Sequence, residues 1–389
     1  MTTTQESLIS VLNVCDNFRP HLSHEPLVPF LLALKSRPPI GLLRPPVVAA
    51  LRADNAWRST HGHPLAWDIP IPADSDGTMN DAQPLPYIAF SPALASASPA
   101  ARTRALAETL ERWRADANKG DGDGDGAFAE VIGGSRWRSE WYDVYLAPGG
   151  ALRTDGRDPL TLLEVPTTTS ASSSSSSYGG GSGGYVFSME RAACALFGVV
   201  TYGVHMTVYE QRGDADRGAD GGETGEIPVR VWVPRRAATK PTYPGMLDNS
   251  VAGGIPGGTS AFDSLVKEAA EEASLDPQLV RKRARAVGSV SYYRQTTAGW
   301  LQPEVQHVYD MRLEPGEVSL APMDGEVESF KLMSVDEVVS CMRAGEFKPN
   351  CALVLIDFLV RHGYLTPENE PRYLEINQRL HGQFDIERW

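Results

Sequence analysis

One segment constrains the fold of this chain more than any other: residues 253–275, GGIPGGTSAFDSLVKEAAEEASL, in which a glycine-rich turn leads directly into an amphipathic helix. Ser260 and Asp263 form a capping pair that predicts where this helix begins. At about 3.6 residues per turn, the acidic residues share one face and the apolar residues share the other. The acidic residues are Glu268, Glu271 and Glu272, and the apolar residues are Phe262, Leu265, Val266, Ala269, Ala270 and Ala273. We therefore expect one side of the helix to pack on a core.

The acidic face of this helix predicts a metal site. Carboxylates at this spacing repel one another unless a cation lies between them, and Mg²⁺ prefers such hard oxygen ligands. Gly253 and Gly254 allow the backbone to approach a ligand closely, and the N-terminus of the helix favours phosphate. A solvated acidic surface is the alternative interpretation. We expect Glu268, Glu271 and Glu272 to bind Mg²⁺ or Mn²⁺.

The length of 389 residues and the order of the local signals predict two folded units. Residues 1–150 are expected to form a smaller N-terminal α/β accessory domain, which ends in the aromatic-rich strand Trp137–Leu146. Residues 151–184 contain a Ser/Gly-rich tract and are expected to be a flexible insertion. In residues 185–389, strands and helices are mixed, which indicates an α/β or α+β domain with C-terminal helices.

Several boundaries in the second unit have clear sequence signals. Ser334 and Glu337 form a capping box that predicts a helix start. Asn350 is expected to cap the run CALVLIDFLVRH, and Gly363 is expected to end that helix. The expected strands are Val204–Glu210, Val229–Val233, Arg283–Tyr293, Val305–Leu313 and Val327–Leu332.

Composition excludes some classes of partner. A net charge of −13 disfavours binding to extended nucleic acid. No stretch resembles a transmembrane helix, and the first residues show no targeting signal, so we expect a cytoplasmic protein that does not bind membranes. The four cysteines are far apart in the sequence, which suits a reducing compartment.

The segment 253–275 resembles the Nudix box, whose pattern is Gly, five residues, Glu, seven residues, Arg-Glu, an aliphatic, any residue, Glu-Glu, any residue, Gly and an aliphatic. Gly253 takes the first position, Glu268 follows the Arg position, Glu271 and Glu272 form the Glu pair, and Leu275 closes the pattern. This resemblance implies an α/β/α sandwich with a mixed sheet and Mg²⁺-dependent hydrolysis of a diphosphate.

Three positions depart from that pattern. Thr259 replaces the first Glu, which leaves the number of metal ions and the general base open. Lys267 replaces Arg, so it keeps the positive charge beside Glu268 and the substrate but lacks the guanidinium fork. Ser274 replaces the second Gly at the end of the helix.

The resemblance extends over most of the chain, excluding the low-complexity inserts. Residues 187–389 are similar to a Nudix subgroup related to the Nudix half of fungal thiamine pyrophosphokinases, and WRSEWYDVY resembles the N-terminal domain of that subgroup. We expect no kinase half, because only a short segment follows this region. The implied substrates are small organic diphosphates, namely thiamine diphosphate or its oxidised analogues, which would be cleaved to monophosphates.

Other candidate site residues lie outside the box. Glu326, in the segment APMDGEVESF, is the first choice for a further catalytic carboxylate, and an exposed loop charge is the alternative. Tyr292, Tyr293 and Trp300 could stack on a ring of the substrate, although core packing is the alternative for these aromatic residues. Three residues that could reach the site from the N-terminal domain are Trp137, Arg138 and Glu140.

Two other functions remain open. Thr259 and Lys267 are also compatible with a non-catalytic Nudix-fold binding module. Within the enzyme class, a nucleotide-sugar or dinucleotide diphosphatase is the alternative. A small-molecule diphosphate is the expected ligand in each case.

Overall fold

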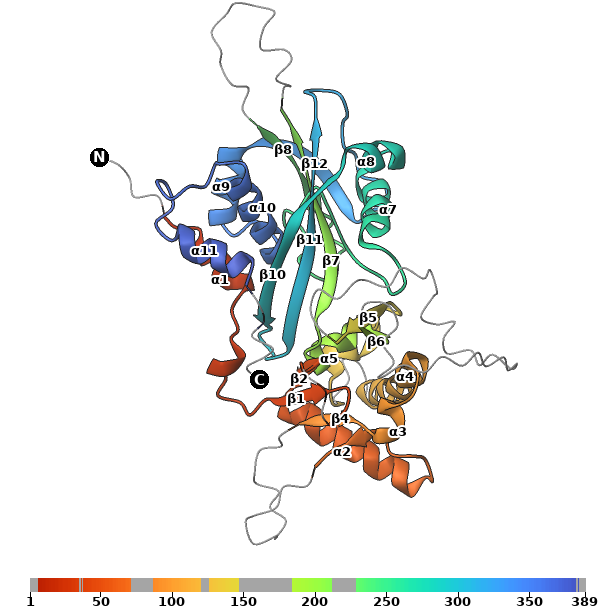
Figure 1. The fold of residues 1–389 in the computed structure, drawn as a ribbon. Helices are drawn as coiled ribbons and strands as arrows, with labels where there is room; N and C mark the ends of the chain where they lie inside the picture. Colours follow the sequence, from red (N-terminus) through yellow and green to blue (C-terminus); the bar gives the residue numbers. More distant parts are fainter. Residues whose placement is uncertain are drawn as a thin grey trace, which may run out of the picture.

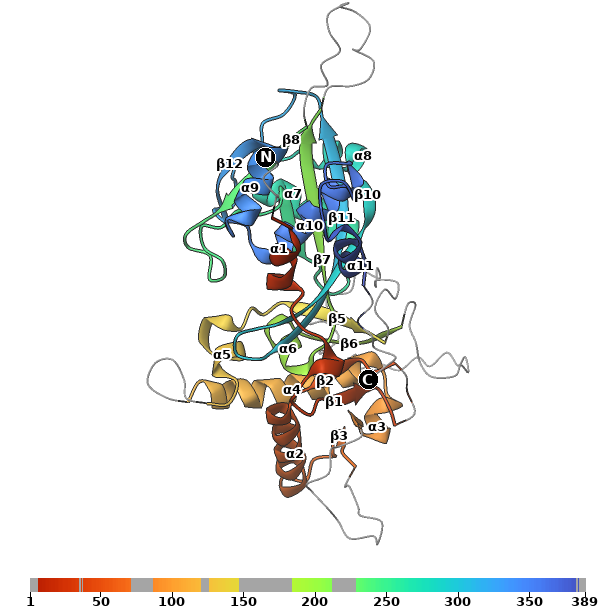
Figure 2. The same ribbon diagram turned by 90° about the vertical axis from the view of Figure 1, so that its left-hand side faces the viewer.

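The computed structural model describes residues 6–34, 36, 38–70, 87–119, 126–146, 184–211, 229–382 and 384. These residues form two units that lie one above the other in Figures 1 and 2, with a long mixed sheet in one unit and shorter strands in the other. Apart from Gly184, the predicted insertion 151–184 lies outside the described residues.

The first unit is built on a four-stranded sheet in the order β2-β1-β4-β3, beside a separate two-stranded sheet of β5 and β6. Its strands are β1 (Val28–Leu31), β2 (Gly41–Leu43), β3 (Trp67–Asp68), β4 (Ile88–Phe90), β5 (Trp141–Tyr145) and β6 (Tyr185–Glu190). Its helices are α2 (Pro45–Thr60), α3 (Pro92–Ala95), α4 (Pro99–Ala117), α5 (Ala129–Ile132) and α6 (Cys194–Phe197), with short 3₁₀ turns at η1 (Pro20–Leu22), η2 (Gly134–Arg136) and η4 (Arg191–Ala193).

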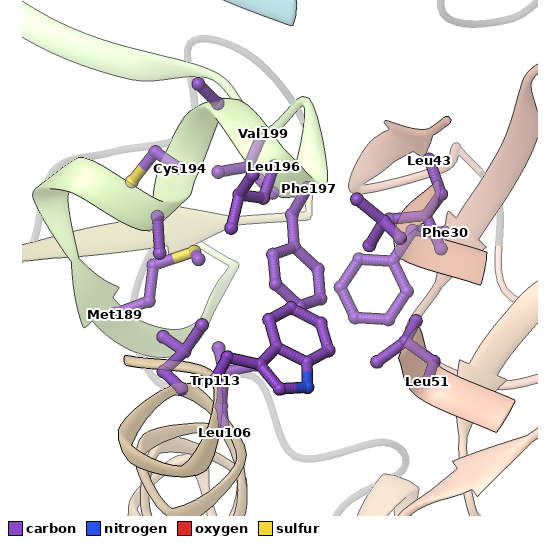
Figure 3. Close-up of a cluster of buried hydrophobic side chains, with 14 of the residues drawn as sticks. Phe30, Leu43, Leu51, Leu106, Trp113, Met189, Cys194, Leu196, Phe197 and Val199 are labelled. Carbon is purple, nitrogen blue, oxygen red and sulfur yellow. The ribbon is translucent and has the colours of Figure 1, made fainter. Parts of the chain in front are cut away.

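The core of the first unit includes residues from both sides of the expected insertion. Phe197 of α6 stacks on Trp113 of α4, with ring centroids 5.9 Å apart, and lies 5.5 Å from Phe30 of β1 (Figure 3). Met189 of β6 is buried in the same cluster. Apolar residues between 186 and 199 are thus buried in the core of the first unit, whereas the sequence analysis placed the start of the second unit at residue 185.

The second unit contains a six-stranded mixed sheet. Strand β7 (Thr201–Glu210) lies at its centre, parallel to β11 (Leu301–Leu313), which pairs with β10 (Arg285–Gln295). On its other edge, β7 pairs with β9 (Val251–Gly254) near its beginning and with β8 (Arg230–Arg236) at its end, and β8 pairs with β12 (Val327–Ser334). Because β9 pairs only with β7 among the described strands, its other side is an edge of the sheet, and α7 (Ala261–Ala273) packs beside it.

Helices cover both faces of this sheet, as the α/β/α sandwich predicted. One face carries α7 (Ala261–Ala273) and α8 (Pro277–Arg283), whose apolar side chains share a core with β7, β9 and β11. The other carries α9 (Val335–Arg343), α10 (Pro349–Arg361), α11 (Tyr373–Leu380) and α1 (Ile9–Cys15). Helix α1 was expected in the N-terminal unit. It packs on the second unit because Leu8, Leu12 and Cys15 are buried against α10 and α11.

The helix signals in the sequence have mixed outcomes. Ser260 caps α7 by accepting a hydrogen bond from the amide of Asp263, and Ser334 forms the predicted capping box. Asn350 is not the cap of α10: the helix begins one residue earlier, at Pro349, whose fixed φ suits the first helical position. Gly363 follows α10 with a φ of +73°, the left-handed conformation that was expected there.

Candidate functional site

Two carboxylates of α7 lie against the edge strand β9. Oε2 of Glu272 accepts a hydrogen bond from the amide of Ala252 at 3.1 Å. The side chain of Glu268 lies over Gly253, where an added Cβ would be only 2.4 Å from its Cδ. A larger residue at position 253 would therefore displace the Glu268 carboxylate, which occupies the space of a side chain.

The electrostatic environment of these carboxylates favours a cation. Burial raises the pKa of Glu268 to about 6, and Glu271 and Glu326 add to this effect while Lys267 opposes it. Burial also raises the pKa of Glu272 well above its usual range. Both groups therefore carry negative charge at neutral pH only at a cost in free energy, which a bound cation would offset.

Lys267 lies between Glu271 and Glu268. Oε2 of Glu271 accepts a hydrogen bond from Nζ of Lys267 at 2.6 Å, whereas Nζ is 3.8 Å from Oε1 of Glu268. Lys267 thus pairs mainly with Glu271. Throughout the described ranges, no three acidic, His or Cys side chains are close enough together to hold a metal ion as they stand. A rotamer change of Glu271, whose side chain is 48% exposed, would be needed to bring three carboxylates together.

Glu326 lies close enough to the carboxylates of α7 to act on them electrostatically. It forms an ion pair with Lys240, and its negative charge contributes to the raised pKa of both Glu268 and Glu272 after the larger effect of burial. The loop before β12 therefore brings a fourth carboxylate towards the acidic side of α7.

The first unit holds the glycine-rich turn in place. The amide of Gly257 donates to the carbonyl of Trp141 at 2.8 Å, and the amide of Gly258 donates to Oδ2 of Asp143 at 3.0 Å. Oδ1 of Asp143 accepts from Oγ of Ser188 at 2.6 Å. Strands β5 and β6 thus position the turn that precedes α7, a role that the sequence did not predict.

The first unit also places a cation and a phenol beside the site. Arg191 forms a 2.7 Å ion pair with Glu140, and its guanidinium is 5.4 Å from the centre of the Tyr142 ring. The hydroxyl of Tyr142 occupies the place of a side chain at Gly254, 1.7 Å from where a Cβ would lie. The positive charge of Arg191 acts on Glu268. Gly254 therefore makes room for Tyr142.

Of the three N-terminal residues proposed to reach the site, Glu140 alone has a charge that is linked to it, through Arg191 and Lys267. Trp137 instead lies under the guanidinium of Arg114 at 4.6 Å, and the amide of Arg138 binds Glu190. The segment WRSEWYDVY was the signal in the sequence. It did not identify Tyr142 or Asp143 as the residues in contact with the box.

The three aromatic candidates are separated in the structure. Tyr292 is buried on the sheet face opposite α7, and its hydroxyl donates to Glu304 at 2.5 Å. Tyr293 packs edge-on against Phe18, and Trp300 belongs to the core of the first unit. The prediction that Tyr293 and Trp300 stack on a substrate is therefore not supported, because their rings are buried in hydrophobic clusters.

Two departures from the box pattern have visible consequences. Ser274 ends α7 with a φ of +54°, a conformation that costs a non-glycine residue free energy and explains why the pattern has Gly there. Thr259 lines a hollow of about 10 Å³ together with Tyr142 and Asp143. This volume holds about one water molecule and no substrate.

Residues 221–352 match the family described as NUDIX domain, and this range includes the whole of β9 and α7. The second unit, which includes this range, therefore has the Nudix fold.

Sequence relatives agree with this assignment. Nudix hydrolase 20, chloroplastic, from Arabidopsis thaliana is 44% identical over 195 residues, covering 50% of this chain and 48% of the relative. An uncharacterized protein of Saccharomyces cerevisiae, YJR142W, is 42% identical over 203 residues, covering 50% and 56%. This chain thus spans about half the length of these relatives. The relationship to Nudix hydrolases is clear, whereas the thiamine pyrophosphokinase relationship and the cytoplasmic location stay predictions.

Solved structures align over a limited part of the chain. DR0079 from Deinococcus radiodurans is 19% identical and covers 40% of this chain and 80% of its own, with a TM-score of 0.28. The Ap4A hydrolase of C. elegans is 9% identical and covers 42% of this chain and 99% of its own, with a TM-score of 0.30.

None of the helices in the described part of the chain combines the length and apolar character needed to cross a membrane.

Proposed function

We propose that this protein hydrolyses the diphosphate bond of a small organic diphosphate in a reaction that depends on Mg²⁺. The observation that carries the proposal is the pair of half-buried carboxylates, Glu268 and Glu272, at the open edge of β9, both with a raised pKa. A structural helix gains nothing from two carboxylates placed in this way, since their charges are costly without a cation.

The donor set fits Mg²⁺ chemically. Glu268 and Glu272 offer carboxylate oxygens, and Glu271 would complete the set after it leaves Lys267. When bound, Mg²⁺ supplies charge neutralisation of the diphosphate and a more acidic water. Gly253 and Gly254 form the edge of the site, because the side chains of Glu268 and Tyr142 pack over them.

The remaining residues have distinct proposed roles. Glu326 accepts a proton from the attacking water, with Lys240 holding the carboxylate in place. Lys267, once separated from Glu271, and Arg191 neutralise phosphate oxygens on the solvent side of the site. These roles account for the cations that surround an otherwise acidic helix face.

The substrate proposal rests on sequence resemblance. Thiamine diphosphate and its oxidised analogues are the first candidates, with monophosphates as products. Dinucleotides and nucleotide sugars are the second candidates. The plant relatives are named hydrolases, which favours an enzyme over a binding module.

Hydrolysis of a panel of diphosphates, with Mg²⁺, with Mn²⁺ and with EDTA, tests the proposal when the monophosphate products are separated and quantified by chromatography. The panel contains thiamine diphosphate, oxidised thiamine diphosphate, ADP-ribose, NADH and a nucleoside triphosphate. Metal-dependent turnover with the highest kcat/KM for the thiamine compounds is expected. Tight binding without turnover of any compound would identify a binding module, and preference for ADP-ribose or NADH would reject the thiamine assignment.

A further inference from the structure

A polar network lies on the sheet face opposite α7, close to the first unit. Glu304 of β11 is half-buried, and its Oε2 accepts hydrogen bonds from the hydroxyl of Tyr292 at 2.5 Å and from Nε2 of Gln306 at 2.8 Å. Nε2 of Gln306 also donates to the Tyr292 hydroxyl at 2.8 Å. Both donors are directed to one oxygen of Glu304. No donor within the described ranges binds the other oxygen, Oε1.

A second acceptor in this network is only weakly satisfied by the described residues. Gln306 is only 3% exposed, and in the part of the chain that the structure describes its Oε1 accepts no hydrogen bond of full geometry, although the side chain of His205 interacts with it. The Gln306 side chain lies over Gly203, where an added Cβ would be 2.2 Å from Oε1. A buried acceptor without a full hydrogen bond costs free energy, which a ligand donor would reduce.

Strand register connects this network to the site on the other side of β9. Gln306 pairs with Gly203, and Gly203 pairs with Gly254, so the three residues form one row across β11, β7 and β9. Adjacent strands are about 4.8 Å apart, so the row spans roughly 10 Å. At its far end the hydroxyl of Tyr142 lies over Gly254, while Glu268 lies over the adjacent Gly253 on the opposite face of β9.

Charges link the same two regions. Glu304 acts electrostatically on Arg191, which in turn acts on Glu268. Glu304 also acts on Lys348, which precedes α10 and whose other anionic neighbours include Asp248. Glu304 has no cation within ion-pair distance in the described residues, although a half-buried carboxylate is usually paired.

We infer that Glu304, supported by Tyr292 and Gln306, is the specificity determinant for the organic part of the substrate, which it recognises through a positively charged group or an N–H donor. The inference rests on the proposed diphosphate chemistry at Glu268 and Glu272. It selects organic diphosphates that carry an amine, an amino-substituted ring or a cationic ring, and it disfavours alkyl and alkenyl diphosphates.

A purely structural network is the competing interpretation, and the substitution Glu304→Gln separates the two. The amide oxygen of Gln can still accept from Tyr292 and Gln306, while its NH₂ group takes the place of the open Oε1. The internal hydrogen bonds are kept, and the atom presented to a ligand changes from acceptor to donor. Sites built to bind a substrate donor reject a mismatch strongly.

The test compares two diphosphates, thiamine diphosphate, which has an amino group and a cationic ring, and isopentenyl diphosphate, which has neither. In Glu304→Gln, kcat/KM for thiamine diphosphate should fall at least tenfold, mainly through KM, and the value for isopentenyl diphosphate should stay within twofold. Glu368→Gln, at an exposed position, is the matched control and should change neither. Tm should change by less than about 2 °C in both variants.

Binding of thiamine monophosphate, measured by calorimetry, tests the inference independently of the proposed function, because it requires no turnover. The wild type should bind it at least tenfold more tightly than Glu304→Gln. A retained difference in binding without any turnover in the wild type would reject the proposed function alone. Equal binding by both proteins, or an equal fall in kcat/KM for both diphosphates, would overturn the inference.

Discussion

Glu268→Gln should stabilise the metal-free protein at neutral pH, because the substitution removes a charge that the fold disfavours. Burial raises the pKa of Glu268 from 4.5 to about 6, and its side chain is 20% exposed. At about 1.4 kcal/mol per pKa unit, the ionised carboxylate costs about 2 kcal/mol at neutral pH. For a chain of 389 residues, this corresponds to a Tm that is higher by about 2.5 °C.

The sign of the pH dependence follows from the direction of the shift. A carboxyl with a raised pKa in the folded state binds a proton more tightly when folded, so its destabilising contribution appears as the pH rises from about 4.5 to about 6. The variant should therefore have a higher Tm than the wild type at pH 7.5, and this difference should shrink towards pH 4.5. The two proteins share all other titratable groups, so the titration of those groups cancels in the Tm difference.

Differential scanning calorimetry in EDTA, from pH 4.5 to pH 8, measures this effect. Glu271→Gln is the matched control on the exposed side of the same helix, and its loss of a surface ion pair should shift Tm by less than about 1 °C. Mg²⁺ should raise the Tm of the wild type more than that of Glu268→Gln. A Tm of Glu268→Gln at or below that of the wild type at pH 7.5, or a difference independent of pH, would refute the reasoning.

Two further changes test how the box is held. Asp143→Asn weakens the hydrogen bond to the amide of Gly258 and should lower kcat/KM roughly tenfold. The KM for Mg²⁺ should change little, and Tm should fall modestly. Unchanged kinetics would mean that the first unit does not position the turn. Ser274→Gly relieves a φ of +54° but removes the hydrogen bond from Ser274 Oγ to the carbonyl of Ala321. Chemical denaturation should show that the free energy of unfolding rises by up to about 1 kcal/mol. A lower free energy of unfolding would mean that the lost hydrogen bond outweighs the relieved strain.

The box helix could be predicted from the sequence because its information is local. The capping pair at Ser260 and the spacing of Leu265, Val266 and Ala269 determine the start of α7 and its buried face, and the structure confirms both. The acidic face was less predictable. Periodicity places Glu271 beside Glu268, but whether Glu271 pairs with Lys267 or turns towards a metal depends on a rotamer that spacing does not specify.

The contribution of the first unit could not be predicted, because it depends on contacts between distant segments. Asp143 and Gly258 are separated by 115 positions, and Tyr142 reaches Gly254 only because β5 packs beside the beginning of β7. The burial of the aromatic candidates Tyr293 and Trp300 could not be predicted for a related reason. Their position after the box said nothing about the clusters in which they are buried.

Phosphate release by the wild type and by Glu272→Gln, each with Mg²⁺ and with EDTA, tests the central claim most directly. Gln keeps the size of the side chain, and its amide oxygen can still accept from Ala252, but it removes the charge that the metal requires. The wild type should hydrolyse thiamine diphosphate or an oxidised analogue only with Mg²⁺, and Glu272→Gln should lose roughly a hundredfold or more in kcat at an unchanged or higher Tm. Equal turnover by the two proteins, or turnover by the wild type in EDTA, would contradict the account.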